Sequence, residues 1–131
     1  MIRSAALAVT LCVIAVAFAD QSGVYSESQA KNGQIIYRKV CSNCHAEDLA
    51  GAEHAPALKG DPFWREWDQQ KARLLYRRII STMPSDDPGS LPEKDVIDIV
   101  AFLLKENGLP VGAKAIERAN QLNDITLERP K

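Results

Sequence analysis

The segment Cys41-Ser42-Asn43-Cys44-His45 constrains the chemistry of this chain more than any other part of the sequence. Two cysteines three positions apart share one turn of a helix, so their thiols can bond to the two vinyl groups of a single porphyrin. His45 follows directly and would supply an axial imidazole nitrogen to the iron. These five residues therefore predict that one haem is bound covalently, at Cys41 and Cys44.

Other uses of a closely spaced cysteine pair fit the sequence less well. A structural zinc site needs four ligands, and the chain has no second Cys or His pair at a similar spacing. A thioredoxin-like redox pair would follow a strand in an alternating strand–helix pattern, which the sequence lacks. Two cysteines in an exported protein would ordinarily form one disulfide. The histidine directly after the second cysteine favours haem over all three.

Residues 1–19 are predicted to be a signal peptide, separate from the folded domain. Met1-Ile2-Arg3 gives a short positive start, an apolar run follows, and Ala17-Phe18-Ala19 has the small–x–small pattern of a signal-peptidase site. The apolar run is shorter than the roughly 18 to 20 residues that span a bilayer. Cleavage would leave residues 20–131 as a periplasmic domain, and an uncleaved N-terminal membrane anchor is the alternative.

Charge and composition narrow the function further. The 131 residues carry 16 Lys and Arg against 17 Asp and Glu, and this balance argues against a nucleic-acid binder. Once Met1 and Cys12 leave with the signal peptide, few side chains remain that hold a transition metal strongly. They are Cys41, Cys44, His45, His54 and Met83. An iron bound by His45 therefore has only His54 or Met83 as a second axial ligand.

The spacing of apolar residues predicts an all-α fold. Helices are expected from Ser26 or Ser28 to about Val40, from Asp61-Pro62 through Trp67, over 71–81, and from Ser90-Leu91-Pro92-Glu93 to Asn107-Gly108. Glycines and prolines mark 46–62 as a loop, and Ser90-Leu91-Pro92-Glu93 predicts a capping box for the last helix. We expect 28–107 to form the core of the domain. Residues 113–131 should add a weak helix and a tail.

Several residues around the motif resemble those of the class I c-type cytochromes. Gly33 and Tyr37 precede Cys41 by eight and four positions, as a helix-crossing pair does in that family. The resemblance implies that the first and last helices cross there, with Phe102 as the partner on the last helix. It covers about residues 28–107 and implies a fold in which short helices and loops surround one covalent haem.

The same resemblance implies roles for residues around the iron. Pro56 stands where the carbonyl of a family proline accepts the N–H of the axial histidine, here His45, and Met83 stands at the second axial ligand. Met83 also lies in a proline-flanked turn after a helix, which favours a ligand over core filler. His54 is the rival ligand, but it lies in the loop that must carry Pro56 beside His45.

A closer resemblance points to a physiological role. Trp64, Ile80–Pro84, Pro88–Leu91 and Asp98–Leu104 are similar to small bacterial cytochromes and haem domains that serve quinoprotein alcohol dehydrogenases. This implies a one-electron carrier between a dehydrogenase and an acceptor such as an oxidase or another cytochrome, with no catalytic residue and no small-molecule substrate. A haem-bearing subunit of a dehydrogenase complex is the alternative. A haem enzyme or gas sensor would need an open iron position.

Two groups of side chains have alternative predicted roles. One consists of aromatic residues that would wall the haem or donate a hydrogen bond to a propionate: Trp64, Trp67 and Tyr76. The other is a basic run on the helix before Met83: Lys71, Arg73, Arg77 and Arg78. This run is a solvated helix face, a set of partners for the haem propionates, or a docking surface for an acidic partner.

Overall fold

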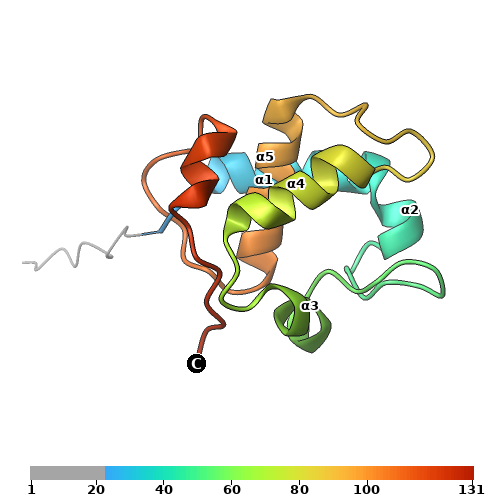
Figure 1. Ribbon diagram of the computed structural model, residues 1–131, viewed down its shortest axis with the longest axis horizontal. Helices are drawn as coiled ribbons and strands as arrows, with labels where there is room; N and C mark the ends of the chain where they lie inside the picture. Colours follow the sequence, from blue (N-terminus) through green and yellow to red (C-terminus); the bar gives the residue numbers. More distant parts are fainter. Residues whose placement is uncertain (1–22) are drawn as a thin grey trace, which may run out of the picture.

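The computed structural model describes residues 23–131, so the predicted signal peptide, 1–19, lies outside the described residues. The helices are α1 (Glu27–Val40), α2 (Ser42–His45), α3 (Gly60–Trp67), α4 (Ala72–Thr82) and α5 (Glu93–Glu106), followed by the 3₁₀ helix η1 (Ala119–Asn123). Figure 1 shows α1 and α5 packed together, with α4 beside them. Within 23–131 the only β pairing is in isolated bridges, which confirms the predicted all-α fold.

The first and last long helices cross at a glycine. A Cβ on Gly33 of α1 would lie 1.9 Å from the backbone oxygen of Asp98 in α5, so a larger residue would force the helices apart. One turn further along, the rings of Tyr37 and Phe102 pack with their centroids 5.3 Å apart. The structure therefore brings Gly33, Tyr37 and Phe102 together at this crossing.

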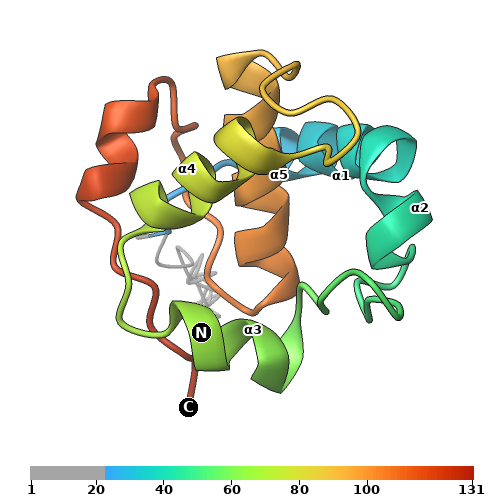
Figure 2. The same cartoon turned by 45° about the vertical axis from the view of Figure 1, so that its right-hand side comes forward.

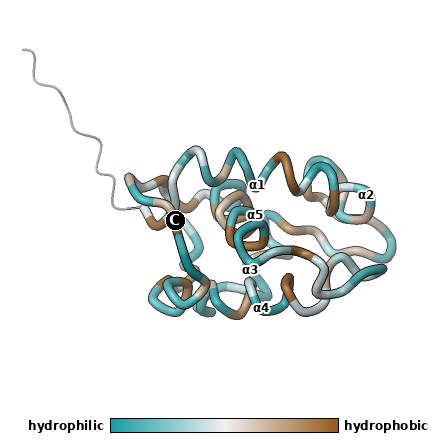
Figure 3. The backbone as a smooth tube through the Cα atoms, turned by 90° about the horizontal axis from the view of Figure 1, so that it is seen from above, coloured by the Kyte–Doolittle hydropathy of each residue, from teal (hydrophilic) through white to brown (hydrophobic). Residues whose placement is uncertain are grey.

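α5 forms the centre of the apolar core. Every residue from 96 to 104 is buried, because α5 is covered on different sides by α1 and α4. Figure 3 shows α5 in the middle of the fold, between α1 and α4. None of the described helices has the length and hydropathy needed to cross a bilayer.

The helix starts differ in how they are capped. Ser26 caps α1, because its hydroxyl oxygen accepts a hydrogen bond from the backbone N–H of Gln29 at 3.2 Å. The predicted capping box before α5 is wrong. The helix begins at Glu93, its N-cap residue is Pro92 in an extended conformation, and no side chain forms a capping hydrogen bond. The carboxylate of Glu93 instead accepts a hydrogen bond from the N–H of Ala119 at 3.1 Å.

The segment after α5 folds back over α4 and ends beside α3 (Figures 1 and 2). It contributes buried side chains to the core: Ile116, Ala119, Leu122, Ile125 and Leu127. Backbone hydrogen bonds join it to the turn between α3 and α4, from Ala72 N to Ile125 O at 2.9 Å and from Leu127 N to Gln70 O at 2.8 Å. The tail, which the sequence left unplaced, therefore completes the core over α4.

Candidate functional site

The two cysteines of the motif lie at the junction of α1 and α2. Cys41 ends α1, and its N–H donates to the carbonyl of Tyr37 at 2.8 Å. The N–H of His45 donates to the carbonyl of Cys41 at 3.0 Å, which closes one turn that also carries Cys44. Cys41 is partly buried and Cys44 is exposed. Burial, followed by the neighbouring Cys44, raises the pKa of the Cys41 thiol to about 11.

The His45 ring is buried and held in one orientation. The side chain is 7% exposed, and Nδ1 lies 2.9 Å from the carbonyl oxygen of Pro56. A carbonyl oxygen only accepts hydrogen bonds, so Nδ1 must carry the proton. Nε2 then keeps its lone pair, and no hydrogen bond to Nε2 is formed by residues 23–131. This is the tautomer that a metal-binding imidazole requires.

The loop between α2 and α3 places Pro56 beside this ring. Two non-glycine residues, Ala46 and Leu49, have positive φ angles of 64° and 61°. Such conformations each cost on the order of 1 to 3 kcal/mol and persist only where surrounding contacts impose them. The phenol of Tyr37 donates to the Ala46 carbonyl at 2.7 Å, and the Leu49 carbonyl accepts from the N–H of Leu58 at 2.8 Å. The crossing of α1 and α5 is thereby tied to the loop.

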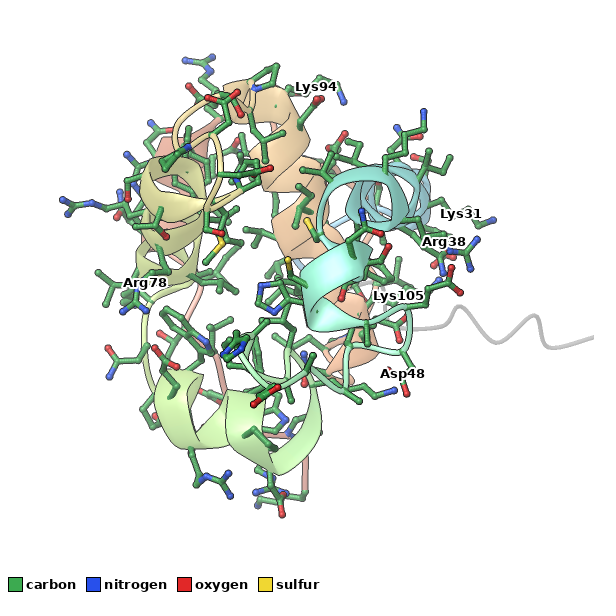
Figure 4. The ribbon with its side chains drawn as sticks, turned by 90° about the vertical axis from the view of Figure 1, so that its right-hand side faces the viewer. Lys31, Arg38, Asp48, Arg78, Lys94 and Lys105 are labelled. Atoms are coloured by element: carbon green, nitrogen blue, oxygen red, sulfur yellow. The ribbon has the colours of Figure 1, made fainter. Side chains whose placement is uncertain are left out.

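Met83 lies where α4 ends. Its N–H donates to the carbonyl of Ile79 at 2.9 Å, and its half-buried side chain packs against the same apolar core as Cys41. Among residues 23–131, sulfur occurs only in Cys41, Cys44 and Met83. Figure 4 shows the yellow sulfur atoms in the region between α2 and α4. Cys41 and Met83 therefore pack against one apolar core from α1 and α4.

His54 and the aromatic residues occupy different environments. The His54 side chain is 91% exposed at the surface of the loop, with the Glu53 carboxylate 3.9 Å away. Trp64 is buried and packs edge-on against Phe63, with ring centroids 5.2 Å apart. Trp67 and Tyr76 are each covered by an arginine: Arg78 lies 5.8 Å from the Trp67 ring and Arg73 lies 4.8 Å from the Tyr76 ring.

The basic run on α4 divides into an inner and an outer part. Arg73 turns inward over Tyr76, and its Nη1 is buried without a hydrogen-bond partner among the described residues. Three cations remain on the outer face around Leu74, which is 45% exposed, and one of them, Arg78, pairs with the Glu66 carboxylate at 3.5 Å. We call Lys71, Leu74, Arg77 and Arg78 the α4 patch.

One polar residue near the site is absent from the sequence-based predictions. Asn107 is buried at the end of α5, and its amide bonds to the backbone of Leu58 and Gly60 in the loop that carries Pro56. An asparagine before a glycine at the end of an apolar stripe signals only the end of a helix. Its contact with a loop far earlier in the chain leaves no local signal in the sequence.

Comparison with known protein families identifies the domain. Residues 28–103, more than half of the chain, match the family described as cytochrome C oxidase, cbb3-type, subunit III. The chain belongs to this family. It is a cytochrome c domain, an electron carrier whose cofactor is covalently bound haem c, and the chain carries the cysteine pair Cys41/Cys44. This confirms the predicted cofactor and the predicted cytochrome c fold.

A solved structure has a similar fold. It is a chain in the crystal structure of the sulfane dehydrogenase SoxCD from Paracoccus pantotrophus, with 21% identity and a TM-score of 0.58. The match covers 75% of this chain and 52% of that chain, so this chain spans about half the length of the one that it matches. At this identity the likeness shows the fold alone. The comparison with curated proteins finds no match.

Proposed function

We propose that this protein is an exported one-electron carrier in which His45 and Met83 are the axial ligands of a haem iron. The hydrogen bond from His45 to Pro56 carries the proposal, because it leaves Nε2 free on a buried ring beside Cys41 and Cys44. Met83 supports it as the remaining soft donor against the same core. An imidazole and a thioether suit both oxidation states of iron, and the thioether raises the potential relative to two imidazoles.

The bound haem supplies the Fe(II)/Fe(III) couple, and the chain supplies orientation and burial. The Pro56 carbonyl holds the His45 ring in one tautomer and makes Nε2 a better donor. Trp64 and the buried residues of α5 contribute an apolar surround that limits the access of water. Electron transfer needs no proton donor and no substrate pocket, so these residues have no further chemical step to perform.

The visible spectrum of the reduced protein, recorded with and without carbon monoxide, tests this proposal. We expect a six-coordinate, low-spin spectrum that carbon monoxide does not change, because both axial positions are occupied by side chains. A high-spin spectrum that responds to carbon monoxide would reveal an open position on the iron. That result would contradict the proposed carrier and favour a haem enzyme or a gas sensor.

We further propose that the electron donor is a dehydrogenase and the acceptor an oxidase or another cytochrome. The similarity of Ile80–Pro84 and Asp98–Leu104 to cytochromes of quinoprotein alcohol dehydrogenases makes a quinoprotein the first donor to test. A role as the haem-bearing subunit of a dehydrogenase complex is the alternative, and co-purification distinguishes them. A free carrier separates from the dehydrogenase during gel filtration, whereas a subunit stays with it.

The α4 patch is the surface that we propose for docking. Lys71, Arg77 and Arg78 lie three or four positions from Leu74, so they surround it on one face of the helix. An exposed apolar side chain among cations suits a partner surface with acidic groups around a small apolar centre. Figure 4 shows Arg78 on the outer side of α4, facing away from Lys31 of α1.

A further inference from the structure

The Asn107 side chain is a buried connector between α5 and the loop that precedes α3. It is 6% exposed, and its Nδ2 donates to the carbonyl of Leu58 at 3.0 Å and to that of Leu103 at 2.9 Å. Its Oδ1 accepts from the N–H of Gly60 at 3.0 Å. Both hydrogens and the oxygen of the amide are therefore used. Leu58 lies 49 residues earlier in the chain, so the contact is a tertiary one and more than a helix cap.

The backbone between Leu58 and His45 transmits this constraint to the imidazole. The N–H of Leu58 donates to the Leu49 carbonyl at 2.8 Å, and the N–H of Gly51 donates to the His45 carbonyl at 3.0 Å. Pro56 lies two residues before Leu58, and its carbonyl oxygen is 2.9 Å from Nδ1 of His45. A shift of the segment that Asn107 holds would therefore lengthen the bond to the ring.

We propose that Asn107 is a positioning residue for His45. By fixing Leu58 and Gly60 to the end of α5, it holds the Pro56 carbonyl within hydrogen-bond distance of Nδ1. The inference rests on the proposed function, in which His45 is an iron ligand. A short Nδ1–H···O hydrogen bond makes Nε2 a stronger electron-pair donor, which stabilises Fe(III) relative to Fe(II). By maintaining this bond, Asn107 lowers the reduction potential.

Gln29 provides a matched control elsewhere in the molecule. It is also 6% exposed, and its amide, like that of Asn107, both donates and accepts backbone hydrogen bonds. Nε2 donates to the Ile116 carbonyl at 2.8 Å, and Oε1 accepts from the Ile116 N–H at 2.9 Å. Gln29 joins α1 to the tail, whereas Asn107 joins α5 to the Pro56 loop. Leucine at either position removes a buried amide and leaves backbone groups without partners.

The experiment compares Asn107→Leu with Gln29→Leu in haem-loaded protein. Two quantities are measured: the reduction potential, and the exchange rate of the His45 Nδ1 proton by NMR of the reduced form. We expect Asn107→Leu to raise the potential and to speed that exchange several-fold, and Gln29→Leu to change neither although both variants lose stability. If Asn107→Leu does not fold, Asn107→Ala removes the same bonds with a smaller side chain and has the same expected result.

Two outcomes overturn the inference, and they are distinguishable. If the parent protein is low-spin and both variants keep its potential and exchange rate, or shift them equally, Asn107 has a structural role only. If the parent itself lacks a low-spin haem signal, the proposed function fails and the inference fails with it. The spectrum of the parent, recorded first, separates these two results.

Discussion

The α1–α5 crossing and the loop between α2 and α3 are held in place by different forces. At the crossing, buried apolar side chains are closely packed, and the backbones approach so closely at Gly33 that a larger side chain does not fit. In the loop most residues are exposed or half-buried, and its shape depends on Leu49, on residues with positive φ and on single hydrogen bonds such as that from His45 to Pro56. Substitutions at the crossing should therefore reduce stability. Substitutions at the proposed iron ligands should change the spectrum and the reduction potential of the haem and leave the fold intact.

The largest effect is expected from Met83→Ala, which removes the proposed second axial ligand of the iron. Removing the thioether opens the sixth position, so the reduced form should bind carbon monoxide and the potential should fall, because the thioether favours Fe(II). Difference spectra with carbon monoxide and a redox titration measure both changes. His54→Ala is the control and should alter neither, since His54 is 91% exposed. The opposite behaviour of the two variants would show that His54 binds the iron.

A smaller effect, on stability alone, is expected from Gly33→Leu at the crossing. Overpacking should lower the free energy of unfolding by about 1 to 3 kcal/mol, because the new side chain meets the backbone of α5. Haem stays attached through its thioether bonds, and the low-spin spectrum is retained. Denaturant titration measures the loss.

The matched control for the crossing is Asn32→Leu, which introduces the same side chain at the neighbouring exposed position of α1. It should be close to neutral in the same titration. A Gly33→Leu protein as stable as the parent would show that α1 and α5 do not approach each other as closely as described.

The mildest effect is expected at the α4 patch, which belongs to neither region. The double variant Arg77→Glu and Arg78→Glu should slow second-order electron transfer with an acidic donor by about tenfold at low salt, with spectrum and potential unchanged. Raising salt should slow the parent in the same way, because the Debye length falls from about 10 Å at 0.1 M to about 3 Å at 1 M. Stopped-flow mixing with the donor across a salt series measures this dependence.

Charge reversal elsewhere controls for net charge. Lys31 and Lys114 are both exposed, and changing both to Glu alters the net charge by the same amount away from the α4 patch. This second double variant should retain most of the parent rate. Equal rates for the parent and both double variants would show that the α4 patch is a solvated helix face and does not bind the donor.

Patterns confined to one element predicted much of the fold. The apolar stripe of α5, the proline and glycine positions of the loop and the cysteine motif each depend on residues close in sequence, and the all-α fold and the haem cofactor are confirmed. Features that depend on distant contacts were missed. The tail is placed by backbone pairing at Ala72 and Gln70, and Asn107 finds its partners 49 residues away.

Side-chain direction is a second limit on sequence reasoning. Charge and helical spacing place Arg73 with its basic neighbours in the sequence. In the structure its guanidinium turns inward over Tyr76, so it does not belong to the outer face. The carboxylate of Glu93 likewise accepts a hydrogen bond from the N–H of Ala119 in the tail. No local pattern before α5 predicts this contact.

The proposed His45–Met83 coordination can be tested by a redox titration of the haem-loaded protein, followed by visible absorption and repeated under carbon monoxide. We expect one reversible one-electron step, a low-spin spectrum in both oxidation states and the same curve under carbon monoxide, because His45 and Met83 hold the iron throughout. A high-spin spectrum, or a curve displaced by carbon monoxide, would contradict this coordination and with it the assignment of the chain as a simple electron carrier.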